Sequence, residues 1–253
     1  MQIGRQAWMA QTSGDLSLKD RMTLLSHSLF PVLKQSIKMY ALAGRSKQNL
    51  QFLSVDDLHL PDSNDVKQAI EKMQSCSSVS LQNHCLRTWH YAVAFSTMQN
   101  LKPDAELLAV SCLLHDLGMT EQHYQHHENC RCFAGQGAYA AQDWSLAQGW
   151  QLPRADQLFD VISMHMNPYV AVDEGVEAHL LQQAASCDVI GSRGFEFSTL
   201  FRQQLFEQYP RLDFNQHMIE FTQEEARIRS KSRTAMVVKS GFKQLVRLNP
   251  YLD

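Results

Sequence analysis

The sequence lacks the features that mark several common classes of protein. No apolar run approaches the roughly 18 residues of a membrane-spanning helix. Residues 1–20 do not contain the basic segment followed by an apolar one that a signal peptide needs. The net charge of −3 gives no general attraction to nucleic acid or to an anionic membrane. We therefore expect a cytoplasmic protein that binds neither a nucleic acid polymer nor a membrane; a homo-oligomer is compatible with these features.

Cysteine follows no recognisable framework either. Six cysteines lie at irregular spacing in 253 residues, unlike the dense pattern of small secreted domains. Cys130 and Cys132 are too close in sequence for an easy local disulfide. We expect all six thiols to be reduced, and we expect that Cys130 and Cys132 do not bind a metal.

Strand-like alternation of apolar and polar residues is nearly absent, whereas apolar residues recur at helical spacing along most of the chain. Residues 1–20 are expected to pack loosely, a first helix to run from about residue 16 to 31, and a second from 32 to 43. A turn at 61–64 follows, in which Ser63 or Asn64 can cap the next helix. The later helices are expected at 65–75, 80–98, 104–117, 134–149, 154–166, 176–191, 198–208 and 215–245. The sequence therefore predicts an all-α protein.

An imidazole and a carboxylate, His115 and Asp116, stand side by side at the end of an apolar helical run. Pro103 suits the first position of this helix, and Gly118 suits the position just past its end. A metal ion beside the helix would stabilise a buried carboxylate and hold a neutral imidazole at once. The alternative is a helix end with a histidine near the negative end of the dipole.

Two further segments carry polar groups on apolar helices. His84 shares a helix face with Arg87, one turn later. Asp188 is a single carboxylate among small and apolar residues, and a buried carboxylate needs a cation or hydrogen-bond donors nearby. A metal ion would meet that need, and so would a salt bridge to Arg87 or Arg193.

Taken together, these segments resemble the HD-domain metal-dependent hydrolase superfamily, and most closely its cyanamide hydratase-like branch. Residues 83–87 (Asn-His-Cys-Leu-Arg) are similar to that branch's Asn-His-Ser-x-Arg, and residues 114–118 to its Leu-His-Asp-Ile/Leu-Gly. Residues 162–168 are similar to its Ile-x-x-His-Thr-x-Pro, and residues 188–191 to its Asp-Val-Val-Gly. The branch usually carries an aromatic-acidic pair before its small-residue helix, where this chain has Cys-Phe-Ala at 132–134. That departure argues for a substrate other than cyanamide.

The resemblance implies one divalent metal ion, held by His84, His115, Asp116 and Asp188. Zinc, manganese, iron and nickel all suit such ligands. It further implies a small-molecule substrate attacked by a metal-activated water, with Asp116 or Asp188 accepting a proton.

Arg87 and His165 would face the charge that develops on the substrate. Two reactions are then possible: hydrolysis of a phosphomonoester, and addition of water to a nitrile-like group. The alternative function is a catalytically degenerate HD module that binds a nucleotide or other small ligand for regulation.

The same resemblance predicts three parts of the chain. Residues 1–65 would form an N-terminal helical extension, residues 66–200 the HD-domain core, and residues 201–253 C-terminal helices packed on the core. The fold expected is thus a helical HD-domain bundle with helical extensions at both ends.

Two other clusters are interpreted more simply. Histidines and thiols crowd one loop, but their spacing matches no structural zinc pattern, so we expect a polar loop near the pocket in which His126 or His127 could contact substrate. A basic tract begins at about residue 227, directly after carboxylates, which favours a solvated helix face over a phosphate-binding site.

Overall fold

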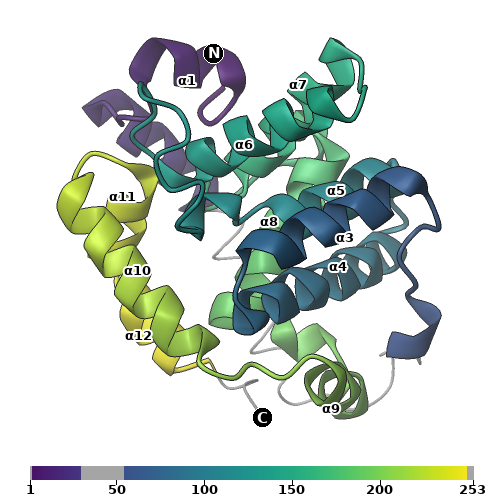
Figure 1. The fold of residues 1–253 in the computed structure, drawn as a ribbon. Coiled ribbons are helices and arrows are strands. Elements are labelled where there is room, and N and C mark those ends of the chain that lie inside the picture. Colours follow the sequence, from purple (N-terminus) through teal and green to yellow (C-terminus); the bar gives the residue numbers. More distant parts are fainter. Residues whose placement is uncertain (1, 30–53, 250–253) are drawn as a thin grey trace.

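The computed structural model describes residues 2–29 and 54–249, and these residues contain helices and no β-strand (Figure 1). The all-α fold predicted from the sequence is confirmed. No helix within the described residues combines the length and apolarity needed to cross a bilayer. The helix predicted over 32–43 lies outside the described residues.

The helices, in chain order, are α1 (Gln6–Thr12), α3 (Asn64–Cys76), α4 (Val79–Gln99), α5 (Ala105–Leu114), α6 (Phe133–Ala147), α7 (Leu152–Met164), α8 (Val176–Ile190), α9 (Thr199–Gln208), α10 (Phe214–Ile228), α11 (Arg233–Lys239) and α12 (Phe242–Arg247). Short 3₁₀ turns occur at Val55–Asp57, Leu117–Met119, Val172–Glu174 and Gly194–Glu196. Residues 18–29 are also helical.

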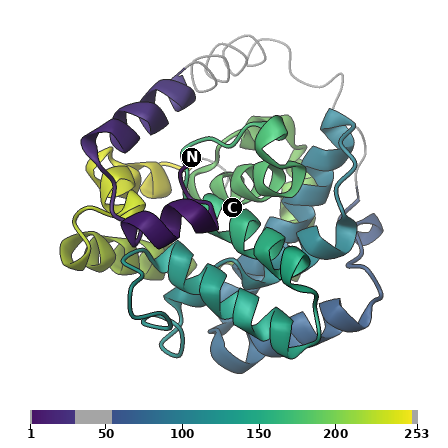
Figure 2. The ribbon, with the colours of Figure 1, turned by 90° about the horizontal axis from the view of Figure 1, so that it is seen from above.

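The core forms where the longer helices pack in pairs. Helix α4 packs along α8, α6 packs along α7, and α5 contacts α3, α4, α7 and α8. Helices α10 to α12 lie on one side of this bundle, with α3 to α5 toward the other (Figure 1). Viewed from above, helical residues 18–29 lie beside the C-terminal helices (Figure 2). The backbone N–H of Leu16 donates to the carbonyl of Lys231 at 2.8 Å, which ties the two ends of the chain together.

Side-chain caps explain where several helices begin. Ser63 accepts a hydrogen bond from the N–H of Val66, and Ser78 caps α4 in the same way. Asp104 caps α5 by accepting from the N–H of Leu107 at 3.0 Å. The prediction that Pro103 opens this helix is therefore wrong, because Pro103 precedes the cap.

Helix α5 also ends earlier than predicted, at Leu114, and Gly118 lies in a separate 3₁₀ turn rather than just past the helix end. The reason is a close contact with α6. A Cβ added to Gly118 would lie 1.9 Å from the carbonyl oxygen of Phe133 and 2.8 Å from the nitrogen of Gly137. The turn therefore needs glycine for lack of space.

Two expectations at the ends of the chain are wrong. The single helix predicted over 215–245 is three helices, since Ser232 caps α11 and Gly241 adopts a left-handed φ of 94° before α12. Residues near the N-terminus are not loosely packed, because Trp8 in α1 is only 2% exposed. The buried Arg233 guanidinium lies over the Trp8 ring at 5.6 Å.

Candidate metal centre

Residues from three core helices and one turn meet at one buried point. His84 lies within α4, whereas His115 and His165 are the residues at which α5 and α7 end. Asp116 follows His115 directly, in the turn that α6 covers. A side chain at a helix end can project beyond its own helix, which is how two consecutive residues, His115 and Asp116, reach the same point.

In each of the three histidines, Nδ1 is already engaged by an acceptor. His84 Nδ1 lies 2.7 Å from Asp188 Oδ2, and His115 Nδ1 lies 2.9 Å from the carbonyl oxygen of Cys112. His165 Nδ1 lies 2.6 Å from the carbonyl oxygen of Ile162. Because these oxygens accept hydrogen bonds, each Nδ1 carries a proton, and in the neutral ring the lone pair is on Nε2.

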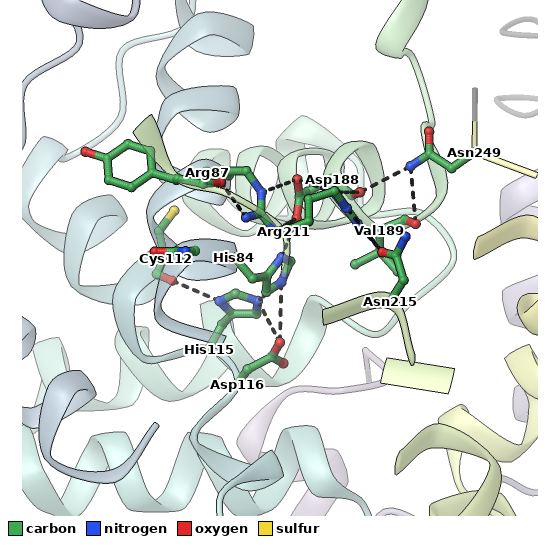
Figure 3. Close-up of polar contacts among 12 residues, drawn as sticks. His84, Arg87, Cys112, His115, Asp116, Asp188, Val189, Arg211, Asn215 and Asn249 are labelled. Atoms are coloured by element: carbon green, nitrogen blue, oxygen red, sulfur yellow. Dashed lines mark hydrogen bonds and ion pairs between the residues drawn. The ribbon is translucent and has the colours of Figure 1, made fainter. Parts of the chain in front are cut away.

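The Nε2 atoms of His84 and His115 face each other at 3.1 Å. Asp116 Oδ2 lies 3.4 Å from the first and 3.2 Å from the second, and all three side chains are at most 3% exposed (Figure 3). Two nitrogens held at about 2.0–2.1 Å from one ion lie about 3.0–3.4 Å apart. The donor set and its spacing therefore fit a divalent metal, and the potential ligand atoms all lie within 4.8 Å of one another.

The buried carboxylate of Asp116 needs a positive charge beside it. Burial alone lowers the pKa of His115, but the adjacent Asp116 carboxylate raises that pKa well above its ordinary value. Burial alone raises the pKa of Asp116, whereas His115 and His84 hold it well below its usual range. The carboxylate is thus ionised in a dry site, where either a shared proton or a metal ion can compensate it.

His165 adjoins this cluster from α7. Its Nε2 lies 3.6 Å from Asp116 Oδ1, and its ring stands edge-on to that of His115 at 5.0 Å. Burial lowers the pKa of His165 to about 3, and the neighbouring His115 acts in the same direction. The ring is therefore neutral near pH 7.

Asp188 lies on the opposite edge of the His84 ring from the cluster (Figure 3). One carboxylate oxygen accepts from His84 Nδ1, and the other accepts from Arg87 Nε at 2.8 Å and from Arg211 Nη1 at 3.0 Å. Burial alone raises the pKa of Asp188, but the two guanidinium groups hold it well below its usual range. In this structure Asp188 therefore orients a histidine, and its role as a fourth metal ligand stays a prediction.

Arg87 lies behind Asp188. Its guanidinium is fully buried and also donates to the carbonyl oxygens of Tyr209 at 2.9 Å and Pro210 at 3.4 Å. The salt bridge between Asp188 and Arg87, considered from the sequence, is present, whereas Arg193 pairs with Glu196.

A cavity of about 330 Å³ opens on the cluster. His84, His115, Asp116 and His165 form part of its wall, and neither Arg87 nor Asp188 is among the described lining residues. Most of the remaining wall comes from α8 and from the C-terminal helices α10 to α12. Its volume lies at the lower end of the range for small-molecule sites.

Residues 81–190 match the family model of the HD domain. The chain carries an HD domain. The four side chains around the candidate metal position and Asp188 all fall within the matched segment. No curated protein matches the chain.

The HD domain does not supply the whole site. Phe214, at the start of α10, stacks on the His84 ring at 4.4 Å, and Arg211 and Asn249 donate to Asp188 and its carbonyl oxygen. Sequence reasoning missed all three residues. Their only visible signal is the turn before α10, which contains Pro210, and nothing there indicates contact with a histidine 130 residues earlier.

The histidine- and cysteine-rich loop does not join the HD domain's cavity. His126 Nε2 pairs with Asp143 at 2.8 Å, and the His127 ring stacks on Tyr139 at 4.0 Å. Neither histidine is among the described lining residues of the cavity. Cys132 accepts from Arg233, Cys130 donates to the carbonyl of Cys132, and both sulfurs are free thiols in the structure.

Proposed function

We propose that this protein is a metal-dependent hydrolase or hydratase that acts on a small molecule in the cavity beside His84, His115 and Asp116. The observation that carries the proposal is the buried His–His–Asp cluster, in which two Nε2 atoms and one carboxylate oxygen converge in the wall of a cavity. An HD domain is compatible with this chemistry.

A divalent ion held by these residues would lower the pKa of a bound water and polarise the substrate. Side chains of the protein would then accept and donate the protons of the reaction. The neutral His165 offers its Nε2 to the cavity, where it can accept a proton from water and return it to the leaving atom. Asp116, which its neighbours keep ionised, would accept a hydrogen bond from that water and so orient it.

We assign Asp188 and Arg87 supporting roles. Metal-binding histidines commonly donate their other ring N–H to a carboxylate, which fixes the tautomer and the ring orientation. His84 and Asp188 form this pair, and Arg87 holds Asp188 in place from behind. In this assignment Arg87 acts through Asp188, whereas the sequence had predicted that it faces the substrate.

Metal analysis tests the proposal first. Protein purified without added metal should contain about one equivalent of a divalent ion, and the His115→Ala variant should contain none. A wild-type protein that stays metal-free after incubation with zinc, manganese and iron would contradict it. A screen of phosphate esters, nucleotides, amides and nitriles then separates an enzyme from a regulatory module, because the module would bind metal and ligand without turnover.

A further inference from the structure

The wall of the cavity shows which class of molecule it takes. From the HD domain, Ala185, Val189 and Ile190 line it along α8. From the C-terminal helices, Met218, Met236 and Val238 line it, and Leu25 closes it from the N-terminal side. Apart from the metal cluster and His165, the described wall is therefore largely aliphatic.

The polar lining residues offer the cavity little hydrogen-bonding capacity. The hydroxyl of Thr222 donates to the carbonyl oxygen of Met218 at 2.7 Å, and that of Ser240 donates to Met236 at 3.0 Å. Thr234 is the exception, since its buried hydroxyl has no hydrogen-bond partner among the described residues. Asn167 and Gln182 also line the wall, but the Asn167 amide pairs with Ile3 and Arg233, and the Gln182 amide nitrogen donates to Pro168 and Ser186. An uncharged polar group on an occupant would thus find few free partners in this wall, among them the Thr234 hydroxyl.

The described wall of the cavity contains no permanently cationic side chain. No lysine or arginine is among the described residues that line the cavity. Three buried guanidinium groups outside this wall pair with other residues, Arg87 and Arg211 with Asp188, and Arg233 with the carbonyl oxygen of Ser163 and with Asn167. Of these three groups, Arg233 alone keeps a nitrogen, Nε, without a partner among the described residues. A phosphate needs charge-assisted donors, whereas an apolar chain gains by leaving water for this wall.

We propose that the substrate is an uncharged molecule with an apolar body, such as an aliphatic amide, nitrile or ester, rather than a phosphate ester or nucleotide. This inference rests on the proposed function, because it assumes that the polar end of the molecule lies at the cluster. An engineered 150 Å³ cavity holds benzene, so 330 Å³ accommodates on the order of ten to fifteen non-hydrogen atoms.

Calorimetric binding of butanamide, hexanamide, octanamide and hexyl phosphate tests the inference on wild-type protein, both metal-loaded and treated with EDTA. Each methylene buried should lower the Kd about fourfold, hence about fifteenfold from one amide to the next. Hexyl phosphate should bind at least tenfold more weakly than hexanamide. Equal or tighter binding of hexyl phosphate, or an affinity that does not rise with chain length, would overturn the inference.

Two lysine substitutions, one in the cavity wall and one outside it, form a matched pair of variants. Leu245 lines the cavity yet is 47% exposed, so Leu245→Lys should fold and should weaken octanamide binding at least tenfold. Leu248→Lys, three residues on and 76% exposed, is not among the described lining residues and should change the Kd less than twofold. Equal effects of the two substitutions would place the amide elsewhere and contradict the inference.

The two metal states keep the proposals distinguishable. Chain-length dependence in EDTA-treated protein supports the apolar site even if no metal is ever retained, in which case only the proposed function fails. Metal retention together with preferred binding of hexyl phosphate overturns the substrate class and leaves the metal centre standing.

Discussion

The chemistry of the cluster depends on which nitrogen of each imidazole carries the proton. In His84, His115 and His165 an oxygen acceptor lies within 2.9 Å of Nδ1. That contact leaves Nε2 of His84 and His115 as potential ligands and Nε2 of His165 as a potential base. The three rings therefore have the same tautomer, and their surroundings decide whether each could act as a ligand or as a base.

For His165, replacement by alanine should separate a catalytic role from metal binding. His165→Ala should keep its metal near the wild-type level, because two histidines and Asp116 remain, while turnover falls by about 10²–10⁴, as expected for a lost general acid or base. Elemental analysis and steady-state rates on the same preparation measure the two effects. Metal lost together with activity would make His165 a ligand, and full activity would assign it to the core beside Met164 and Met166.

At the scale of elements, the position of His115 and Asp116 depends on how closely the turn after α5 approaches α6. Gly118 and Gly137 meet without side chains between them, and a Cβ on Gly137 would lie 3.2 Å from the carbonyl oxygen of His115. The turn that carries His115 and Asp116 is thus held by backbone contact with the start of α6.

Gly118→Ala should therefore damage the site without altering any polar side chain. Its Cβ would overlap the Phe133 carbonyl, so α6 must move, at a cost of at least about 1–3 kcal/mol in the free energy of unfolding. Thermal unfolding should show a lower midpoint, and a metal titration should show weaker binding.

Gly149→Ala is the matched control for this substitution. Gly149 has a left-handed φ of 90°, and its added Cβ would meet nothing within 4 Å. It should cost some stability through backbone strain and leave metal affinity unchanged. If both alanine variants bound metal like the wild type, the close turn would have no part in forming the site.

At the scale of the whole molecule, Asp188 joins the HD domain to the C-terminal part of the chain. Its carboxylate pairs with Arg87 from α4 and with Arg211 from the segment before α10, and Asn249 donates to its carbonyl oxygen (Figure 3). The candidate metal centre and the packing of the C-terminal helices therefore share one buried ionic group.

Asp188→Asn should affect both of these features. The amide can still accept a hydrogen bond from His84, so metal affinity should fall only about 10- to 100-fold, as for other residues that orient a ligand. Two buried guanidinium groups lose their counter-charge, which should lower the free energy of unfolding by about 3–5 kcal/mol. Metal titration and denaturant unfolding measure the two changes. Loss of metal as complete as in His115→Ala would instead make Asp188 a direct ligand.

The sequence by itself determined the all-α class, most helix positions and the candidates His84, His115, Asp116 and Asp188, because these follow from local periodicity, caps and the order of these four residues along the chain. The ends of the helices were harder to predict from the sequence. The end of α5 depends on contact with α6, and the breaks after α10 and α11 depend on single residues, Ser232 and Gly241, within an otherwise helical pattern.

Only the tertiary structure decided what each of these residues faces. Whether Asp188 turns toward the cluster or toward Arg87 and Arg211 depends on the charges that surround it, and those come from α4 and from the segment before α10. The cavity is likewise formed by segments separated by more than 100 residues. Periodicity identifies an apolar face but cannot specify its partner, because the partner is set by packing and by buried charge between elements distant in sequence.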